Sequence, residues 1–323
     1  MAKLKKQHMT IHWKAIVQDD SSIPATEATL KEKATLVGRI GLMMLSVGTG
    51  AWRVRNSMNK VSRCLGITCT ADIGLLAISY TCIEGTDTYT QSISLPTTGV
   101  NTHKLMELEL FMKEFPDKVS TCSVKHIHEV LDEIQKFPAN YKAWNLGLAS
   151  ALACGAFTFL LGGGPVEMCC AFLGAGVGNF VRKKMLGHSI SLLANVAVSV
   201  AASCLVYVLT ILLAQSLLSV SAVHQAGYIC AMLFVIPGFP LITGGIDLAK
   251  LDLRSGLERV SYALLIILTA TMTGWATAAI CQFQPADFEP LQLQKWTLLC
   301  FRLITSFCGV YGFSLMFNSP RKM

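Results

Sequence analysis

The chain has 323 residues, of which 52% are hydrophobic and 15% are charged, and its formal net charge is +7. Soluble globular domains carry about 25% charged residues, and this composition excludes a disordered chain, a collagen-like chain and a secreted disulfide scaffold. Residues 185–246 contain no Asp, Glu, Lys or Arg. Because a soluble fold cannot keep so long an uncharged stretch in solution, the second part of the chain is predicted to lie in a membrane.

The cysteines and the basic residues argue against three classes of site. The twelve cysteines form no C-x-x-C pair, and a thiol in an apolar segment acts as a small hydrophobic side chain, so we expect no metal site and no disulfide framework. Basic residues are interleaved with acidic ones in the first part and cluster at segment ends in the second, which indicates membrane topology rather than nucleic-acid binding. No G-x-x-x-x-G-K-[ST] motif occurs, and we expect no cofactor and no ATP hydrolysis.

The N-terminal residues have the pattern of a soluble domain. The chain begins with a basic segment that lacks the apolar run of a signal peptide, so we expect residues 1–142 to remain in the cytoplasm. The apolar stretch Ile40–Trp52 is shorter than the roughly 20 residues that span a bilayer, and it predicts a buried helix of a soluble domain. A second helix is expected over Arg53–Cys64.

Strands and two more helices are expected in the same domain. Residues 67–95 are rich in Ile, Thr, Tyr and Ser, alternate in places and contain a turn at Glu84–Asp87, so they predict a small meander. Asn101 is expected to cap a helix with apolar residues at helical spacing, and a similar helix precedes Pro138. The first part is therefore predicted to be an α+β cytoplasmic domain.

An enzymatic function has little support in the sequence. His103, His126 and His128 have acidic residues nearby, and His128 and Asp132 lie four residues apart on one helix face. Pairs at this spacing are usually surface stabilisation. We therefore expect no catalytic residue, and turnover by the soluble domain alone would contradict this expectation.

Six apolar segments follow and predict a membrane α-helical bundle of about six transmembrane helices. Five of them belong to a transmembrane domain over residues 143–282, and the last lies within residues 283–323. The six segments are Trp144–Leu161, Val166–Val181, Ser189–Leu218, Ala226–Thr243, Val260–Cys281 and Trp296–Phe317.

The loops between these segments predict the orientation. Basic residues lie at Lys142, at 182–184, between Lys250 and Arg259, and at 321–322, all on one side of the expected bundle. Because cytoplasmic loops carry an excess of Lys and Arg, both termini are expected in the cytoplasm. The chain is then a multi-pass protein of the cell's inner (plasma) membrane.

Glu167 is the first candidate for a functional residue inside the membrane. It lies in the first turn of an expected helix, after Gly162–Gly164 and Pro165. A carboxylate there can complement the helix N-terminus, or it can bind a proton or repel anions at the outer mouth of a pathway. Both interpretations stay open. Gly174, Gly176 and Gly178 follow on this helix and indicate close helix packing.

The second candidate site is a broken span. Pro237, Gly238 and Pro240 fall within one apolar segment, where they remove helical hydrogen bonds near the inner half of the membrane. Such interruptions point to binding sites in transporters. The freed carbonyls and the Thr243 hydroxyl could bind an ammonium or hydroxyl group of a small solute, with Asp247 supplying a charge. A simple proline kink is the alternative.

Arg302 is the one basic residue within an expected span. It has no obvious acidic partner in the sequence, and a charge in lipid is costly. An anionic dicarboxylate would favour Arg302 and Arg182, whereas threonine or serine also needs a partner for its ammonium group. The sequence does not choose between these solutes.

Four segments of the chain carry a family resemblance over roughly residues 35–282. They are GTGAWRVRNSMNKVSRCLGI, TTGVNTHKLMELELFMKEF, ACGAFTFLLGGGPVEMCCAFLGAGVGNFVRKKM and, as the most specific, VIPGFPLITGGIDLAKLDLRSGLERVSYALL. The chain resembles the threonine/serine exporter family, whose members join a cytoplasmic N-terminal domain to a bundle of membrane helices. In the family pattern the Arg-Val pair is generally followed by Glu. Here Arg53 matches the pattern, but Arg55 takes the place of the acid.

The resemblance also bears on partners. Residues Gly312–Phe313 and Phe317–Pro320 resemble the beginning of the family's second membrane half, which split systems supply as a separate small subunit. The chain is therefore expected to need a second-half membrane subunit, or to form a homo-oligomer, in the lipid bilayer.

The resemblance implies export of small polar amino acids, threonine and serine, driven by the proton gradient. Two alternatives stay open: a dicarboxylate (succinate-like) exporter subunit, and a membrane scaffold or regulator that transports nothing.

Overall fold

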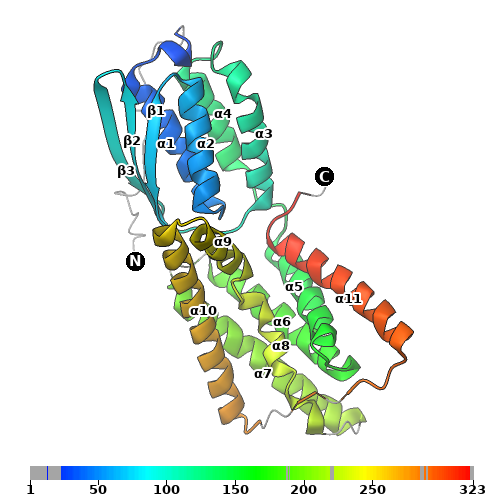
Figure 1. Cartoon of the computed structure of the whole chain (residues 1–323). Coiled ribbons are helices and arrows are strands. Elements are labelled where there is room, and N and C mark those ends of the chain that lie inside the picture. The colour runs from blue at the N-terminus through cyan, green and yellow to red at the C-terminus, as the bar shows by residue number, and fades with distance from the viewer. Residues whose placement is uncertain are drawn as a thin grey trace. The chain divides into compact units, whose positions relative to one another are not determined.

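The computed structural model describes residues 13, 23–186, 188, 190–218, 222–283, 287, 288 and 290–320 (Figure 1). The chain divides into two compact units. Unit 1 spans Met1–Pro138, Gly238–Tyr262 and Pro320–Met323, and unit 2 spans Ala139–Pro237 and Ala263–Ser319. The segment Gly238–Tyr262, which the sequence alone places in the transmembrane domain, thus packs with the N-terminal residues.

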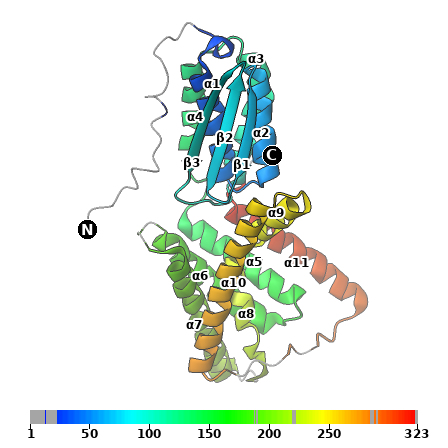
Figure 2. The ribbon, with the colours of Figure 1, turned by 60° about the vertical axis from the view of Figure 1, so that its left-hand side comes forward.

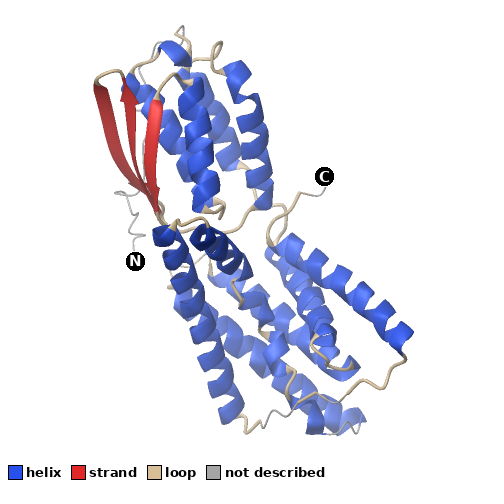
Figure 3. Cartoon of the chain, in the orientation of Figure 1, coloured by secondary structure: helices blue, strands red, loops and turns tan. Residues whose placement is uncertain are grey.

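The sheet of unit 1 is the predicted meander. Its three antiparallel strands are adjacent in the order β1-β2-β3, and one face of the sheet is covered by α1 and α2 (Figures 2 and 3). Helices α3 and α4 pack behind α1 and α2, which completes the α+β fold. The elements are α1 (Leu30–Ser46), α2 (Ala51–Cys64), β1 (Thr68–Ile73), β2 (Ala77–Glu84), β3 (Asp87–Ser94), α3 (Thr102–Lys118) and α4 (Val124–Lys136).

The first two helices differ from their predicted bounds. The apolar stretch Ile40–Trp52 is not one helix, because the chain turns after Ser46 and α2 begins at Ala51. Gly48 has a positive φ of 88° in this turn, a conformation that favours glycine. Helix α1 starts earlier, at Leu30, where Thr29 and Glu32 form a capping box. Apolar composition alone could not reveal either boundary.

The expectation of a surface His128–Asp132 pair is wrong. His128 is only 3% exposed, and the side chain of Arg39 of α1, which is 1% exposed, packs against it. Arg39 Nη1 lies 2.9 Å from His128 Nδ1 and donates to the His128 carbonyl at 2.9 Å, and Nη2 forms an ion pair with Asp132. Burial, with the Arg39 charge as the second cause, lowers the pKa of His128 to about 3.

This buried histidine predicts acid-sensitive stability. A histidine with an ordinary pKa near 6.5 unfolded and a pKa of about 3 folded binds its proton more tightly in the unfolded state. Its contribution to the free energy of unfolding is therefore complete above pH 6.5 and is lost as pH falls toward 3, by at most about 1.4 kcal/mol per pH unit.

His128→Asn keeps an acceptor for Arg39 and removes the titration. We expect the thermal midpoint of the purified full chain to fall less steeply between pH 6.5 and 4.5 in this variant. His126→Asn, a change at an exposed position of the same helix, is the control and should leave the slope unchanged. An unaltered slope in His128→Asn would contradict the prediction.

Unit 2 is a bundle of apolar helices. Helix α5 packs against both α6 and α11, and α6 packs against α7. Helix α10 begins in unit 1 and continues into unit 2 at Ala263. The helices that build the bundle and its connection are α5 (Ala143–Leu160), α6 (Pro165–Met185), α7 (Leu192–Leu218), α8 (Tyr228–Ala231), α9 (Gly238–Ala249), α10 (Leu253–Ile280) and α11 (Lys295–Met316).

The predicted count of six spans is not confirmed. Within the described ranges, four helices are long and apolar enough to cross a membrane, namely α5, α7, α10 and α11, and the bent pair Tyr228–Val235 and Gly238–Ala249 is a fifth if it forms one span. Helix α6 is outside this set, although its 21 residues are long enough. It carries Glu167 near its start and three basic residues in its last turn, which lower its mean hydropathy.

Candidate functional site

Unit 2 contains a partly buried acid–histidine pair at the start of α6. Glu167 lies in the first turn of α6 and is 3% exposed. Its Oε1 is 2.7 Å from Nδ1 of His224, and its Oε2 accepts a hydrogen bond from the Gly164 N–H at 2.9 Å. The two interpretations of Glu167 are thus compatible, because one oxygen caps the helix while the other contacts a second titratable group.

The loop that carries His224 is held by α7. The Tyr207 hydroxyl donates to the His224 carbonyl at 2.7 Å. Gly227 follows in the loop, and a Cβ at this position would collide with the Tyr207 ring and lie 3.0 Å from the Glu167 Cβ. Glycine therefore allows the loop to approach both side chains closely. Sequence reasoning missed His224, whose only signal is a single histidine in an otherwise uncharged loop.

The backbone of the broken span is interrupted at more positions than a single kink at Pro237 would produce. Helix α8 has four residues, a single turn over Leu233–Val235 follows, and α9 begins only at Gly238. Side chains of neighbouring helices bind its carbonyls: the Ser203 hydroxyl donates to Ala231 O at 2.7 Å, and Arg182 Nη1 donates to Phe234 O at 3.1 Å. Irregular backbone in an apolar bundle requires such partners.

Two asparagines lie near Arg182 along α6 and at the start of α7. Asn179 donates to Leu146 O at 2.8 Å, and Asn195 donates to Arg182 O at 3.2 Å. Both side chains are at most 2% exposed, and among the described residues their Oδ1 atoms have no hydrogen-bond partner. Buried carboxamide oxygens without partners are uncommon, and here one belongs to the helix of Arg182 and the other to a side chain that binds the Arg182 backbone carbonyl.

The predicted residues beyond the break are placed as follows. A Cβ at Gly238 would meet no atom within 4 Å, and the Thr243 hydroxyl donates to Phe239 O at 3.0 Å within α9. Asp247 is fully buried in unit 1, where its Oδ2 accepts from the Ala51 N–H at 3.0 Å. The structure therefore groups Asp247 with α2 and does not group it with Glu167.

Arg53 and Arg55, the pair that the family pattern singles out, bind different acids. Arg53 forms an exposed ion pair with Glu109 of α3. Arg55 pairs with Asp252 at 2.6 Å, and this hydrogen bond raises the pKa of Arg55. The basic residue that replaces the family's acid thus has an acidic partner almost 200 positions away in the sequence.

Arg302 lies on an exposed face of α11. Within the described part of the chain its guanidinium group has no ion-pair partner, and the neighbouring Leu303 and Phe301 are also exposed. Only α5 packs extensively against α11, so most of this helix surface is covered by no other described element.

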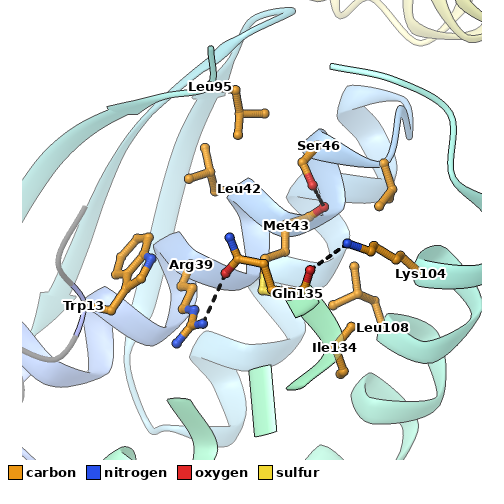
Figure 4. Close-up of a pocket in the computed structure, with 11 residues that line it drawn as sticks. Trp13, Arg39, Leu42, Met43, Ser46, Leu95, Lys104, Leu108, Ile134 and Gln135 are labelled. Atoms are coloured by element: carbon orange, nitrogen blue, oxygen red, sulfur yellow. Dashed lines mark hydrogen bonds between the residues drawn. The ribbon is translucent and has the colours of Figure 1, made fainter. Parts of the chain in front are cut away.

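Unit 1 has a separate small cavity of about 80 Å³ between α1, α3 and α4 (Figure 4). Its polar groups bind one another: Arg39 contacts the Gln135 side chain, and Lys104 donates to the Gln135 carbonyl at 2.6 Å. Its walls are otherwise mainly apolar. In the described residues no group of three or more His, Cys, Asp or Glu is arranged to hold a metal ion.

The chain is similar in sequence to two curated proteins. The chain is 25% identical over 236 residues to the "Probable succinate transporter subunit YjjP" of Klebsiella aerogenes, a match that covers 72% of this chain and 87% of the relative. It is 24% identical over 237 residues to the protein of the same name from Escherichia coli strain K12, covering 72% of this chain and 88% of the relative. No solved structure matches.

The family described as "Putative threonine/serine exporter" matches residues 35–281. This range includes most of the N-terminal fold, the acid–histidine pair, the broken span and α10. The chain belongs to the threonine/serine exporter family and is a membrane transport protein.

Proposed function

We propose that the chain exports a small solute bearing a carboxylate group, with threonine and serine as the first candidates, and that protons drive the export. The Glu167–His224 pair is the observation that carries this proposal. An ionisable side chain inside a membrane protein is by default a functional-site hypothesis, and histidine is the side chain whose ordinary pKa allows it to change charge near neutral pH. A proton can be exchanged between Oε1 and Nδ1 over 2.7 Å.

Solute recognition is proposed at the polar groups around the broken span. The Arg182 guanidinium group suits a carboxylate, and the unpaired Oδ1 atoms of Asn179 and Asn195 suit an ammonium group. This combination favours an amino acid. The names of the two relatives favour succinate instead, for which the asparagine oxygens would be poor partners. Membership of a transporter family argues against an enzyme.

A second membrane chain is proposed as a partner. Arg302 is exposed on an apolar helix, and a charge facing lipid is costly unless it reaches the interface or a carboxylate. The relatives are named as subunits. A family second-half subunit with an acidic residue at this depth would provide the carboxylate, and a second copy of this chain is the alternative.

The orientation remains the one that the basic loops predict, with both termini in the cytoplasm of an inner-membrane protein. We expect cysteines introduced at the exposed positions Pro165 and Asp287 to react with an impermeant thiol reagent added outside intact cells, above the background of the parent protein. Cysteines at Lys184 and Leu251 should react only after permeabilisation. The reverse pattern would overturn the orientation.

Efflux from loaded cells tests the proposed function. Labelled threonine, serine and succinate are measured in cells that express the chain alone or together with a second-half subunit. Faster efflux of threonine or serine supports the main proposal, and faster efflux of succinate alone replaces it with the dicarboxylate alternative. If no solute moves even with the subunit present, the chain is a scaffold or regulator.

A further inference from the structure

We propose that residues 247–259, which we call the latch, fasten the N-terminal fold to membrane helix α10 and make export depend on that attachment. All latch contacts described below lie within unit 1. The attachment itself is independent of what the protein transports, whereas its effect on export rests on the proposed function.

The centre of the latch is a buried ion pair. Asp247 and Arg259 are 0% and 2% exposed, and Arg259 Nε lies 3.2 Å from Asp247 Oδ2. The same Oδ2 accepts from the Ser255 hydroxyl at 3.1 Å and from the Ala51 N–H at 3.0 Å. Since Ala51 is the first residue of α2, the carboxylate caps a helix whose start lies 196 positions earlier.

The N-terminal fold is shaped to receive this carboxylate. The N-cap position of α2 is Gly50, which has no side chain to cap the helix itself. A Cβ at Gly50 would lie 2.9 Å from Asp247 Oδ1, closer than real contacts allow. Arg259 Nη2 also donates to the Thr49 carbonyl at 2.8 Å. One ion pair thus binds both an N–H and a C=O at the start of α2.

Two further ion pairs and one hydrogen bond, which we call the ring, join the latch to the N-terminal fold. The latch contributes Asp252, which pairs with Arg55 at 2.6 Å, and Arg254, which pairs with Asp72. Glu258 accepts from the Leu75 N–H at 2.6 Å. The signs alternate between the two sides, so a shifted register would place like charges together. Exposed pairs add little binding energy, and we therefore assign specificity to the ring and attachment to the buried centre.

The latch includes the first residues of α10, a helix that continues into unit 2. Helix α10 runs without interruption over Leu253–Ile280, and its first ten residues belong to unit 1 while the rest belong to unit 2. It is also one of the helices apolar enough to span a membrane. Because α10 is shared by both units, we assign to Asp247 and Arg259 the attachment by which the N-terminal fold acts on export.

Release of a cleaved fragment tests the attachment without any solute. A protease site is inserted between Pro138 and Ala139 of the full chain, which is purified in detergent, cleaved and passed over a sizing column. We expect the N-terminal fragment to stay with the remainder in the parent, and at least tenfold more of it to separate in Asp247→Ala/Arg259→Ala. Lys118→Gln, which breaks an exposed pair elsewhere in the fold, is the control.

A charge exchange distinguishes loss of the latch from general misfolding. Arg55→Asp should increase release, and Arg55→Asp/Asp252→Arg should restore retention, because the exchanged pair keeps its complementarity. Equal retention in all variants would overturn the latch. Export is then measured in the uncleaved variants at matched expression. Released fragments with export at the parental rate would overturn the dependence of export on the latch, whereas a parent that exports nothing contradicts only the proposed function.

Discussion

Glu167→Gln is expected to lower solute efflux by at least tenfold and to remove its dependence on the proton gradient. The carboxamide keeps an oxygen for the Gly164 N–H, which Glu167 Oε2 accepts at 2.9 Å, so the start of α6 stays capped. The variant loses the carboxylate beside His224 Nδ1, which is the group proposed to accept and release the coupling proton. A tenfold change corresponds to about 1.4 kcal/mol, which is modest for a buried charge-assisted hydrogen bond.

His224→Asn is the matching change on the other side of the pair. It keeps a polar group near the position of Nδ1 and removes the imidazole ring, so it should reduce efflux in the same direction. Asp287→Asn, at an exposed acid in the connection between α10 and α11, is the control and should export at the parental rate. Efflux is measured at matched expression and at external pH values from about 5 to about 8. Parental rates and pH dependence in Glu167→Gln would exclude Glu167 from coupling.

Local patterns predicted the sheet of unit 1 and the start of α3. Alternation and a tight turn predicted the meander, and the Asn101 side chain accepts from the Lys104 N–H as a helix cap should. These features depend on residues within a few positions of one another. The boundary between α1 and α2 was missed because an apolar run carries no information about a turn whose glycine has a positive φ.

The partners of the candidate site residues could not be predicted, because they are distant in sequence. Glu167 meets a histidine 57 positions later, and Asp247 caps a helix 196 positions earlier. Asp247 follows an apolar segment, so hydropathy places it at the inner end of a span, and only the fold reveals its contact with α2. The unusual Arg55 was visible in the sequence, but its partner Asp252 was not.

The span count is not confirmed, for a related reason. Hydropathy averages over a window and treats 226–243 as one apolar segment, whereas the backbone there forms two short helical pieces before α9. The carbonyls of this stretch are bound by Ser203 and Arg182. Those two side chains come from α7 and α6. The sequence of residues 226–243 therefore does not reveal that other helices provide the hydrogen-bond donors for its carbonyl groups.

Gly174→Leu is expected to prevent unit 2 from reaching its native packing. A Cβ at Gly174 would lie 2.8 Å from the Ser203 carbonyl oxygen of α7 and 3.1 Å from the Ala231 Cβ of α8. The first neighbour is backbone, so it can move only if α6 and α7 separate. Membrane helices that lack a hydrophobic force between them depend on such close approach, and overpacking costs about 1–3 kcal/mol even for smaller insertions.

Gly245→Leu is the matched control, because a Cβ at Gly245 in α9 would meet no atom within 4 Å. Replacing a helical glycine there should gain about 0.8 kcal/mol from helix propensity. Thermal unfolding in detergent and the yield of monodisperse protein distinguish the two variants, with Gly174→Leu lowering both and Gly245→Leu lowering neither. If Gly174→Leu unfolds at the parental temperature, α6 and α7 are not in the close contact that places Glu167 beside the loop of His224, and the proton-coupling proposal loses its geometric basis.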